Sequence, residues 1–338
     1  MGTARIPAPV PRGLAVRLSV TERCQLRCTY CLPERTPEGV LSAKTKAGCS
    51  PELPTPDLLA LLRLLHETHG IRRLRFTGGE PLLRRDLPEL IAGAAELGIG
   101  DLALTTNAQR LAHRLPALRD AGLQRLNISL DSLHPETFQR LTRGGRLADT
   151  LAGIEAALAH GFQPLKLNTV VLGGINDDEV ETLLHFALRS SIHLRFLELM
   201  PVGEGGRFFQ RQYVSTGETL DRLRRAGFAL EAMAWDPRET SRDYRVRAPE
   251  GIEGVCGFIS PTSQPFCGGC ERVRLTAQGH LHGCLARAGH EELHPLLAMP
   301  DPDAARAALR DAVSAAFTRK QKGDRFQETV SSMSQLGG

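Results

Sequence analysis

Short apolar runs alternate with longer amphipathic stretches from residue 14 to residue 199 of this chain. The apolar runs predict strands, at 14–20, 72–76, 102–106, 125–130, 165–171 and 193–199. The stretches between them predict helices, near 56–69, 86–98, 109–121, 146–160 and 177–190. Strands that alternate with helices favour a parallel βα architecture. The periodicity leaves a closed barrel, a partial barrel and an open doubly wound sheet as alternatives.

The pattern changes after about residue 200. The glycines at 203, 205 and 206 predict a loop, and 216–227 reads as one more helix. Shorter strands are then predicted at 242–248, 255–260, 272–276 and 279–282, followed by a late helix at 301–319. The proline-containing segment 33–56 predicts a long loop, which in an α/β enzyme is often functional.

Composition and charge narrow the function classes. The 338 residues allow about two domains, or one large α/β domain with an appendage. The chain has 42 basic and 38 acidic residues, a balance too even to indicate nucleic acid binding. It shows neither a secretory signal nor a run of about eighteen apolar residues. We therefore expect a cytoplasmic protein that acts on neither nucleic acid nor a membrane.

The eight cysteines are spaced in a pattern that indicates metal chemistry. In a reducing compartment, clustered cysteines are more often metal ligands or catalytic thiols than disulfides. Cys24, Cys28 and Cys31 directly follow the first predicted strand, where a parallel βα fold builds its active site. Three thiolates would leave one iron of a cubane cluster open to a non-protein ligand. The alternative, three small apolar residues on one helical face, is disfavoured by the polar residues between 22 and 29.

A second triplet, Cys267, Cys270 and Cys284, lies near the other end of the chain. A structural zinc site is the serious alternative to a cluster there, because His280, His282 and His290 could each supply a fourth ligand. Cys49 and Cys256 belong to neither triplet, and we interpret both as free or buried thiols.

Several motifs identify a family. The segment CQLRCTYC at 24–31 resembles the signature of the radical S-adenosylmethionine (radical SAM) enzymes, and TGGEP at 77–81 resembles their motif after the second strand. The whole chain resembles the GTP 3',8-cyclases of molybdenum cofactor biosynthesis. Supporting segments are FTGGEPLLRRDL (76–87), LTTNA (104–108), LNISLDSL (126–133), LKLNTVV (165–171), RFLELMPVG (195–203) and ISPTSQPFCGGCERVRLTAQGHLHGCL (259–285). The second triplet, the following Arg-x-Arg and the terminal Gly337–Gly338 distinguish these cyclases from other radical SAM enzymes.

The resemblance implies an α/β fold: an incomplete (β/α)6 TIM-type barrel with a C-terminal second-cluster region covering its open side. The barrel would span residues 1–235. Residues 236–338 would carry the second cluster, substrate arginines and the Gly-Gly tail.

The resemblance also implies the cofactors, two [4Fe–4S] clusters and S-adenosyl-L-methionine. The first triplet would bind a cluster whose open iron is chelated by S-adenosylmethionine, with Gly79 at the amino group. Tyr30, Ser129 and Met200 match the family's other contacts to this cofactor. The second triplet would bind a cluster whose open iron holds the guanine of GTP. Without the cysteines, Gly78–Gly79 would be interpreted as a plain turn.

Several basic residues would bind the triphosphate of GTP. The positions that match the family's substrate channel are Arg17, Arg73, Arg75, Lys166, Arg195, Arg272 and Arg274, with Thr105 as a polar contact. Arginine offers bidentate donors to phosphate, and Arg17, Arg75 and Arg195 alternate with apolar residues on predicted strands. The alternative for each is a surface arginine on an edge strand. The catalytic Gly337 and Gly338 would insert into the active site, although terminal glycines are more often a frayed end.

The implied function is that of a lyase. It converts GTP to (8S)-3',8-cyclo-7,8-dihydroguanosine 5'-triphosphate, the first step of molybdenum cofactor biosynthesis. A 5'-deoxyadenosyl radical takes the hydrogen from C3' of the ribose, and C3' then bonds to C8. Implied partners are GTP, an electron donor of the flavodoxin or ferredoxin type, and a downstream cyclic pyranopterin monophosphate synthase. The family often dimerises, so a homodimer is expected.

Two other functions remain open at this point. One is a radical SAM enzyme with another substrate, such as a peptide-modifying enzyme, although these have more cysteines near the C-terminus. The other is a non-catalytic iron–sulfur or zinc protein, which would leave TGGEP unexplained. The chain also departs from the family at Ala108, where glycine is commoner, at Glu271, where a neutral residue is usual, and in the unusual 33–56 loop with Cys49.

Overall fold

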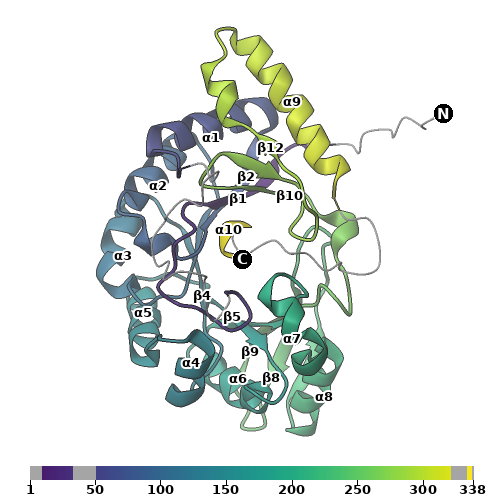
Figure 1. Ribbon diagram of the computed structural model, residues 1–338. Coiled ribbons are helices and arrows are strands. Elements are labelled where there is room, and N and C mark those ends of the chain that lie inside the picture. Colours follow the sequence, from purple (N-terminus) through teal and green to yellow (C-terminus); the bar gives the residue numbers. More distant parts are fainter. Residues whose placement is uncertain (1–9, 33–50, 321–332, 337–338) are drawn as a thin grey trace, which may run out of the picture.

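The computed structural model describes residues 10–32, 51–320 and 333–336. Its centre is a curved sheet whose strands surround a common interior (Figure 1). Six of these strands are parallel and adjacent in chain order: β1 (Leu14–Ser19), β2 (Ile71–Thr77), β3 (Leu102–Thr106), β4 (Arg125–Ser129), β5 (Lys166–Val171) and β6 (His193–Glu198). All six were predicted from the apolar runs, with ends that shift by at most one residue.

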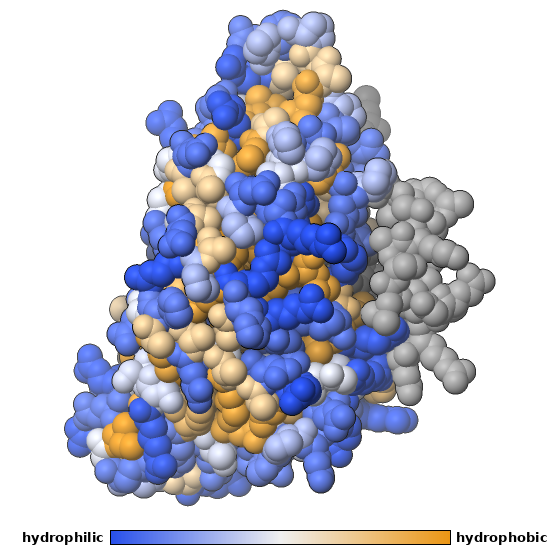
Figure 2. Space-filling view, turned by 90° about the vertical axis from the view of Figure 1, so that its left-hand side faces the viewer, coloured by the Kyte–Doolittle hydropathy of each residue, from blue (hydrophilic) through white to orange (hydrophobic). Residues whose placement is uncertain are grey.

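Helices cover the outside of this sheet (Figure 1). They are α1 (Thr55–His69), α2 (Leu87–Glu96), α3 (Leu111–Asp120), α4 (Pro135–Thr142), α5 (Leu147–Ala159) and α6 (Val180–Arg189). Strand β1 shows why the layers form: Leu14, Val16 and Leu18 are fully buried in the core shared with the helices. The residues between them have side chains on the opposite face, so Arg17 faces the interior. Figure 2 shows the outer face as mainly hydrophilic, with apolar patches between charged side chains.

Later strands extend both ends of the parallel sheet. Strands β10 (Arg272–Leu275) and β9 (Glu253–Ile259) run parallel to β1 and β6 respectively. Antiparallel strands follow on each side: β11 (His280–His282), β12 (Glu291–Glu292), β8 (Arg242–Arg247) and β7 (Ala229–Ala232). In the described part of the chain the two outer strands, β12 and β7, do not pair with each other. The incomplete (β/α)6 barrel is therefore confirmed.

The remaining helices flank or enter the open barrel. They are α7 (Glu204–Gln212), α8 (Thr216–Arg225), α9 (Pro302–Thr318) and α10 (Met333–Leu336), with short 3₁₀ turns at Pro81–Leu83, Asp177–Glu179, Cys267–Gly269 and His294–Ala298. Helix α10 lies in the middle of the ring of strands (Figure 1). None of the helices that the structure describes combines the length and apolarity needed to cross a membrane.

The prediction of a loop at 203–206 was wrong, because helix α7 begins at Glu204. Only Gly203 has the positive φ, 53°, that favours glycine in a turn. Gly205 is needed for a different reason: a Cβ there would lie 2.5 Å from the carbonyl oxygen of Met200. Glycine at this position allows close packing of a helix and does not mark a break in it. Helices α4 and α10 and strands β7 and β12 were also not predicted from the sequence.

Candidate active site

The first cysteine triplet occupies the loop directly after β1, as predicted. The thiols of Cys24, Cys28 and Cys31 are free and partly exposed. The backbone NH of Cys31 donates to the carbonyl of Cys28 at 2.9 Å, which folds the last two cysteines into one turn. Asn107 Nδ2, from the loop after β3, donates to Cys24 Sγ at 3.8 Å. The loops after β1 and β3, two strands that flank β2 in the sheet, therefore meet at this triplet.

The TGGEP segment packs directly against the cysteine loop. The NH of Gly79 donates to the carbonyl of Thr21 at 2.7 Å, and the NH of Glu80 donates to that of Arg23 at 2.7 Å. A Cβ on Gly79 would lie 2.4 Å from the carbonyl oxygen of Arg23, so only glycine fits. The glycine thus sets the position of the loop that carries the thiols.

Glu80 is a buried carboxylate that the sequence analysis quoted but did not assign. It accepts hydrogen bonds from Thr106 Oγ1 at 2.7 Å and from the NH of Asn107 at 2.8 Å. Burial raises its pKa to about 7, although these hydrogen bonds oppose the rise. By fixing residues 106 and 107, Glu80 orients the asparagine that reaches Cys24.

The residues proposed to contact S-adenosylmethionine lie around the same loop. Tyr30 Oη donates to Asp131 Oδ2 at 2.6 Å, two residues after Ser129 at the end of β4. A Cβ on Gly205 would approach both the carbonyl of Met200 and, at 3.5 Å, that of Tyr30. Tyr30, Ser129 and Met200 therefore all reach this side of the barrel from different strand ends. Asp131 is an addition that the sequence analysis missed, and burial raises its pKa to about 6.

The two triplets are spaced for a cluster and not for one metal ion. Among the described residues, the only His, Cys, Asp or Glu group with ligand atoms all within 4.8 Å of one another is His280, His290 and Glu292. One zinc ion at about 2.3 Å from each thiolate would bring the sulfurs to about 3.8 Å. Both triplets are wider than this, as the separate irons of a cluster require. This spacing argues against the zinc alternative for the second triplet.

The second triplet gathers beside two cations. Arg272 Nε donates to Cys270 Sγ at 3.4 Å, and Lys320 Nζ donates to the same sulfur at 3.6 Å. Burial raises the pKa of Cys270, but Arg272 and Lys320 outweigh it and lower the pKa to about 6. A thiolate is thus favoured here. Lys320, which lies just after α9, was missed because it is 50 residues from the cysteine that it contacts.

Arginines stand side by side across three strands at the centre of the barrel. Arg17 on β1 is in register with Arg274 on β10 and with Arg75 on β2. Burial lowers the pKa of Arg17 well below its usual value, and the charges of Arg274 and Arg75 lower it further. Nε of Arg75 is buried without a hydrogen-bond partner among the described residues. Buried, mutually repelling guanidinium groups are a strong indication of an anionic ligand.

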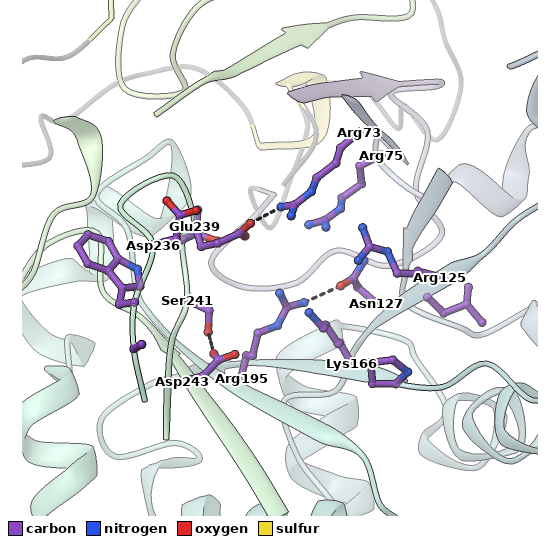
Figure 3. A pocket seen from close by; sticks show the side chains of 15 residues that line it. Arg73, Arg75, Arg125, Asn127, Lys166, Arg195, Asp236, Glu239, Ser241 and Asp243 are labelled. Carbon is purple, nitrogen blue, oxygen red and sulfur yellow. Dashed lines mark hydrogen bonds and ion pairs between the residues drawn. The ribbon is translucent and has the colours of Figure 1, made fainter. Parts of the chain in front are cut away.

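A cavity of about 300 Å³ continues from this row of arginines. Figure 3 shows Arg73, Arg75, Arg125, Lys166 and Arg195 pointing into it from four strands. Burial, helped by the nearby charge of Arg195, lowers the pKa of Lys166 to about 8. Arg125 is a cation that the sequence analysis missed. Thr105 is in register with Asn127, whose Oδ1 accepts from Arg195 Nη2 at 2.6 Å.

The opposite wall of this cavity is acidic and comes from the connection between β7 and β8 and from the start of β8. It comprises Trp235, Asp236, Glu239, Ser241 and Asp243. Arg73 Nη1 pairs with Glu239 Oε1 at 2.5 Å, so this arginine sits at the rim and is already neutralised (Figure 3). The same connection supports the second triplet, because a Cβ on Gly269 would lie 2.3 Å from the carbonyl oxygen of Pro237.

The chain's C-terminal helix reaches the arginine row. Arg274 Nη1 donates to the carbonyl of Leu336 at 2.9 Å, and Leu336 is buried. Met200 packs with Met333 and Leu336. Gly337 and Gly338 lie outside the described residues. Their insertion stays a prediction, and Leu336, the residue before them, is buried and bonded to Arg274.

Two of the three departures from the family acquire a local explanation. Ala108 has a φ of 61°, a left-handed conformation in which glycine would be favoured. Glu271 pairs with Arg72 Nη2 at 2.9 Å, which neutralises its charge beside the second triplet. Cys256 is fully buried in strand β9, as expected of a core thiol. Cys49 and most of the 33–56 loop lie outside the described residues.

Comparisons with known proteins agree with this geometry. Residues 18–187 match the radical SAM superfamily, and residues 192–326 match the family described as Molybdenum Cofactor Synthesis C. A GTP 3',8-cyclase from Listeria monocytogenes is 36% identical over 332 residues, 96% of each chain. One from Heliobacterium modesticaldum is 43% identical over 279 residues, 80% of each chain.

Solved structures show the same fold. The S-adenosylmethionine-bound structure of SuiB from Streptococcus suis superimposes with a TM-score of 0.56, covering 88% of this chain and 68% of that one. The identity is 14%, so this likeness concerns the fold alone.

Proposed function

This chain belongs to the GTP 3',8-cyclase family of radical SAM enzymes, and from that membership we propose how its residues share the reaction. It is an enzyme that uses two [4Fe–4S] clusters and S-adenosylmethionine to convert GTP to 3',8-cyclo-7,8-dihydroguanosine 5'-triphosphate in molybdenum cofactor synthesis. Family membership sets aside the peptide-modifying and non-catalytic alternatives. The observation that carries the residue assignment is the row of arginines in the barrel interior, of which Arg274 lies within electrostatic range of Cys270 and Cys284 in the second triplet.

Cys24, Cys28 and Cys31 hold the first cluster in this proposal, and Tyr30, Gly79, Ser129 and Met200 contact S-adenosylmethionine. When bound, the two cofactors supply the 5'-deoxyadenosyl radical that takes the hydrogen from C3' of GTP. Asn107 supports the site by its contact with Cys24 Sγ, and Asp131 holds the Tyr30 hydroxyl. These side chains position the reacting atoms, and the packed loops exclude water.

Cys267, Cys270 and Cys284 hold the second cluster, whose open iron takes the guanine of GTP. Its sulfur ligands fit this role because Arg272 and Lys320 favour the thiolate of Cys270. The guanine would then lie next to Arg272 and Arg274, which continue along β10 into the arginine row.

The triphosphate of GTP is bound by the cations of the interior. These are Arg17, Arg73, Arg75, Lys166, Arg195, Arg272 and Arg274, assisted by Thr105 and, from the cavity, by Arg125. Several arginines can each donate two hydrogen bonds to phosphate oxygens. Burial and the repulsion between these arginines lower the pKa values of Arg17 and Arg75, and an anionic ligand would offset both effects.

Gly337 and Gly338 complete the active site in this proposal. The support is the hydrogen bond that Arg274 donates to the carbonyl of Leu336, the residue that precedes them in the sequence. Glycine suits such a place because its backbone can approach a ligand closely.

The wider assignments are also proposals. We divide the chain into the barrel at 1–235 and the second-cluster region at 236–338. We place the enzyme in the cytoplasm, where thiols stay reduced, with a flavodoxin- or ferredoxin-type electron donor. A cyclic pyranopterin monophosphate synthase would consume its product, and a homodimer is proposed from the family.

An anaerobic assay tests the function and the site together. Cluster-loaded protein should form cyclised GTP and 5'-deoxyadenosine when given GTP and S-adenosylmethionine. Arg75→Ala should lose most of the cyclised product, whereas the exposed Arg140→Ala serves as the matched control. Formation of 5'-deoxyadenosine without any cyclised GTP by the unaltered protein would contradict the substrate assignment.

A further inference from the structure

Four metal-binding side chains gather on one face of the β11–β12 ribbon. His280 on β11 is directly opposite Glu292 on β12, so both side chains lie on the same face. His282 is two residues along β11, and His290 is two residues before Glu292, so the strand alternation places them on that face too. The strand pairing by itself therefore brings three imidazoles and a carboxylate together.

The side chains are close enough to share one ion. The ligand atoms of His280, His290 and Glu292 all lie within 4.8 Å of one another. The rings of His280 and His290 are 4.2 Å apart, and that of His282 is 5.1 Å from His290. A zinc-sized ion at about 2.0–2.1 Å from each of four tetrahedral ligands would bring the atoms to about 3.3 Å from one another. His290 and Glu292 are exposed and can make this adjustment by side-chain rotation.

These groups have spare coordination capacity. Within the part of the chain that the structure describes, the carboxylate of Glu292 forms neither an ion pair nor a hydrogen bond, whereas its neighbour Glu291 pairs with Arg319. Nδ1 of His282 is buried and has no hydrogen-bond partner there. A buried imidazole nitrogen without a partner is costly, and a metal ion would satisfy it.

We propose that His280, His290 and Glu292 bind a divalent transition-metal ion of the zinc class, with His282 as a fourth ligand. Imidazole and carboxylate donors suit zinc, whereas magnesium and calcium require mainly oxygen ligands. The site is distinct from both cysteine triplets and shares no ligand with them. Bound metal would fasten the two-residue strand β12 to β11, two residues from the proposed cluster ligand Cys284.

Zinc binding to the anaerobic, cluster-loaded enzyme tests this site. Equilibrium dialysis should show one Zn²⁺ per chain, with unchanged iron content. Zinc-edge X-ray absorption should show nitrogen and oxygen ligands at about 2.0–2.1 Å and no sulfur at about 2.3 Å. His290→Ala should weaken the binding by about ten-fold or more, and Glu292→Gln should weaken it too.

His113→Ala is the matched control, because His113 is an exposed histidine on α3 far from the ribbon in sequence. It should bind zinc like the unaltered enzyme. Three outcomes would overturn the proposal: no retained zinc, sulfur in the zinc ligand shell, or equal affinity of the His290→Ala variant. Since His290 and Glu292 are exposed, both variants should fold, which circular dichroism and iron content would verify.

Discussion

Single side chains set the electrostatics of this active site. Lys320 places an ammonium group 3.6 Å from Cys270 Sγ and also donates to the carbonyl of Arg272. It lies over the ring of Phe317 and is largely buried, so its charge is poorly screened. Arg17 is the opposite case, a cation surrounded by other cations. A positive charge therefore favours the thiolate of Cys270 when it is on Lys320, whereas on Arg17 it is repelled by neighbouring cations.

Lys320→Gln should lower the reduction potential of the second cluster. Removing one positive charge about 5 Å away, at an effective dielectric constant of about 20, corresponds to a shift on the order of 100 mV. Redox titration followed by electron paramagnetic resonance measures it. Lys320→Arg should retain most of the original potential, and the first cluster should not change in either variant. An unaltered second potential in Lys320→Gln would exclude this role.

Arg17→Met should weaken GTP binding but make the GTP-free protein more stable. The lowered pKa of Arg17 means that folding disfavours its charged form, so an apolar side chain relieves this cost. We expect about 1 kcal/mol of added stability and about a ten-fold loss of GTP affinity. Thermal unfolding and equilibrium binding measure the two effects. Arg140→Met on the exposed face of α4 should change neither, and a destabilised Arg17→Met would refute the repulsion argument.

At the scale of elements, loops that join different strands hold the ligands in place. The TGGEP segment after β2 supports the cysteine loop after β1, and the β7–β8 connection supports the second triplet through Pro237 and Gly269. The same connection carries Glu239 to Arg73. Each cluster site thus depends on a neighbouring loop that supplies no ligand.

Gly79→Ala should remove the first cluster and leave the second. A Cβ would lie 2.4 Å from the carbonyl oxygen of Arg23, so the cysteine loop must shift. The iron content should fall from about eight to about four per chain, because each cluster holds four irons. Gly100→Ala is the control, since a Cβ there meets no atom within 4 Å. Full iron content in Gly79→Ala would show that the loop can adapt.

Glu239→Gln should strengthen GTP binding. In the GTP-free protein the carboxylate of Glu239 neutralises Arg73 at 2.5 Å, and it must give way to the triphosphate. Removing its charge frees the arginine, for a gain of about two- to five-fold, as expected of a partly exposed pair. Equilibrium binding of GTP at constant salt measures the change. Glu231→Gln, at an exposed site on β7, should have no effect, and weaker binding by Glu239→Gln would contradict the idea.

At the scale of the whole molecule, the open barrel has one proposed cofactor site on each side of a cationic interior. The first triplet lies after the end of β1. In the second triplet, Cys267 and Cys270 lie before β10, which pairs with β1, and Cys284 lies after β11. Arg17, Arg75 and Arg274 form the shared wall between them. Because the barrel is incomplete, β10 can pair with the edge of β1 that faces away from β2.

GTP alone should change the spectrum of the second cluster and leave that of the first unchanged. The reason is that the arginine row continues along β10 to Cys270, whereas the first triplet contacts Asn107 and the TGGEP region. An anaerobic titration followed by electron paramagnetic resonance would show this. S-adenosylmethionine alone should change the spectrum of the first cluster and leave that of the second unchanged. A GTP effect confined to the first cluster would reverse the assignment of the two sites.

The sequence by itself determined the chemistry of this protein. Each triplet is defined within a short stretch of chain, and apolar alternation predicted every parallel strand of the barrel, because both signals are local. Glycine at 203–206 was misread, since packing against Met200, and not a turn, required Gly205. Residues that act across large separations gave no such signal, among them Asn107, Asp131, Arg125 and Lys320.

Only the tertiary structure decided which residues meet. Strand register placed Arg17 between Arg75 and Arg274, and no pattern in the chain states a register across parallel strands. The same holds for Lys320 beside Cys270 and for the histidines and Glu292 on the β11–β12 ribbon. The residues that can bind a cluster or a metal ion are recognised from their types and their local spacing in the sequence. The electrostatic potential around those ligands depends on burial and distance, which arise only when the sheet curves around them.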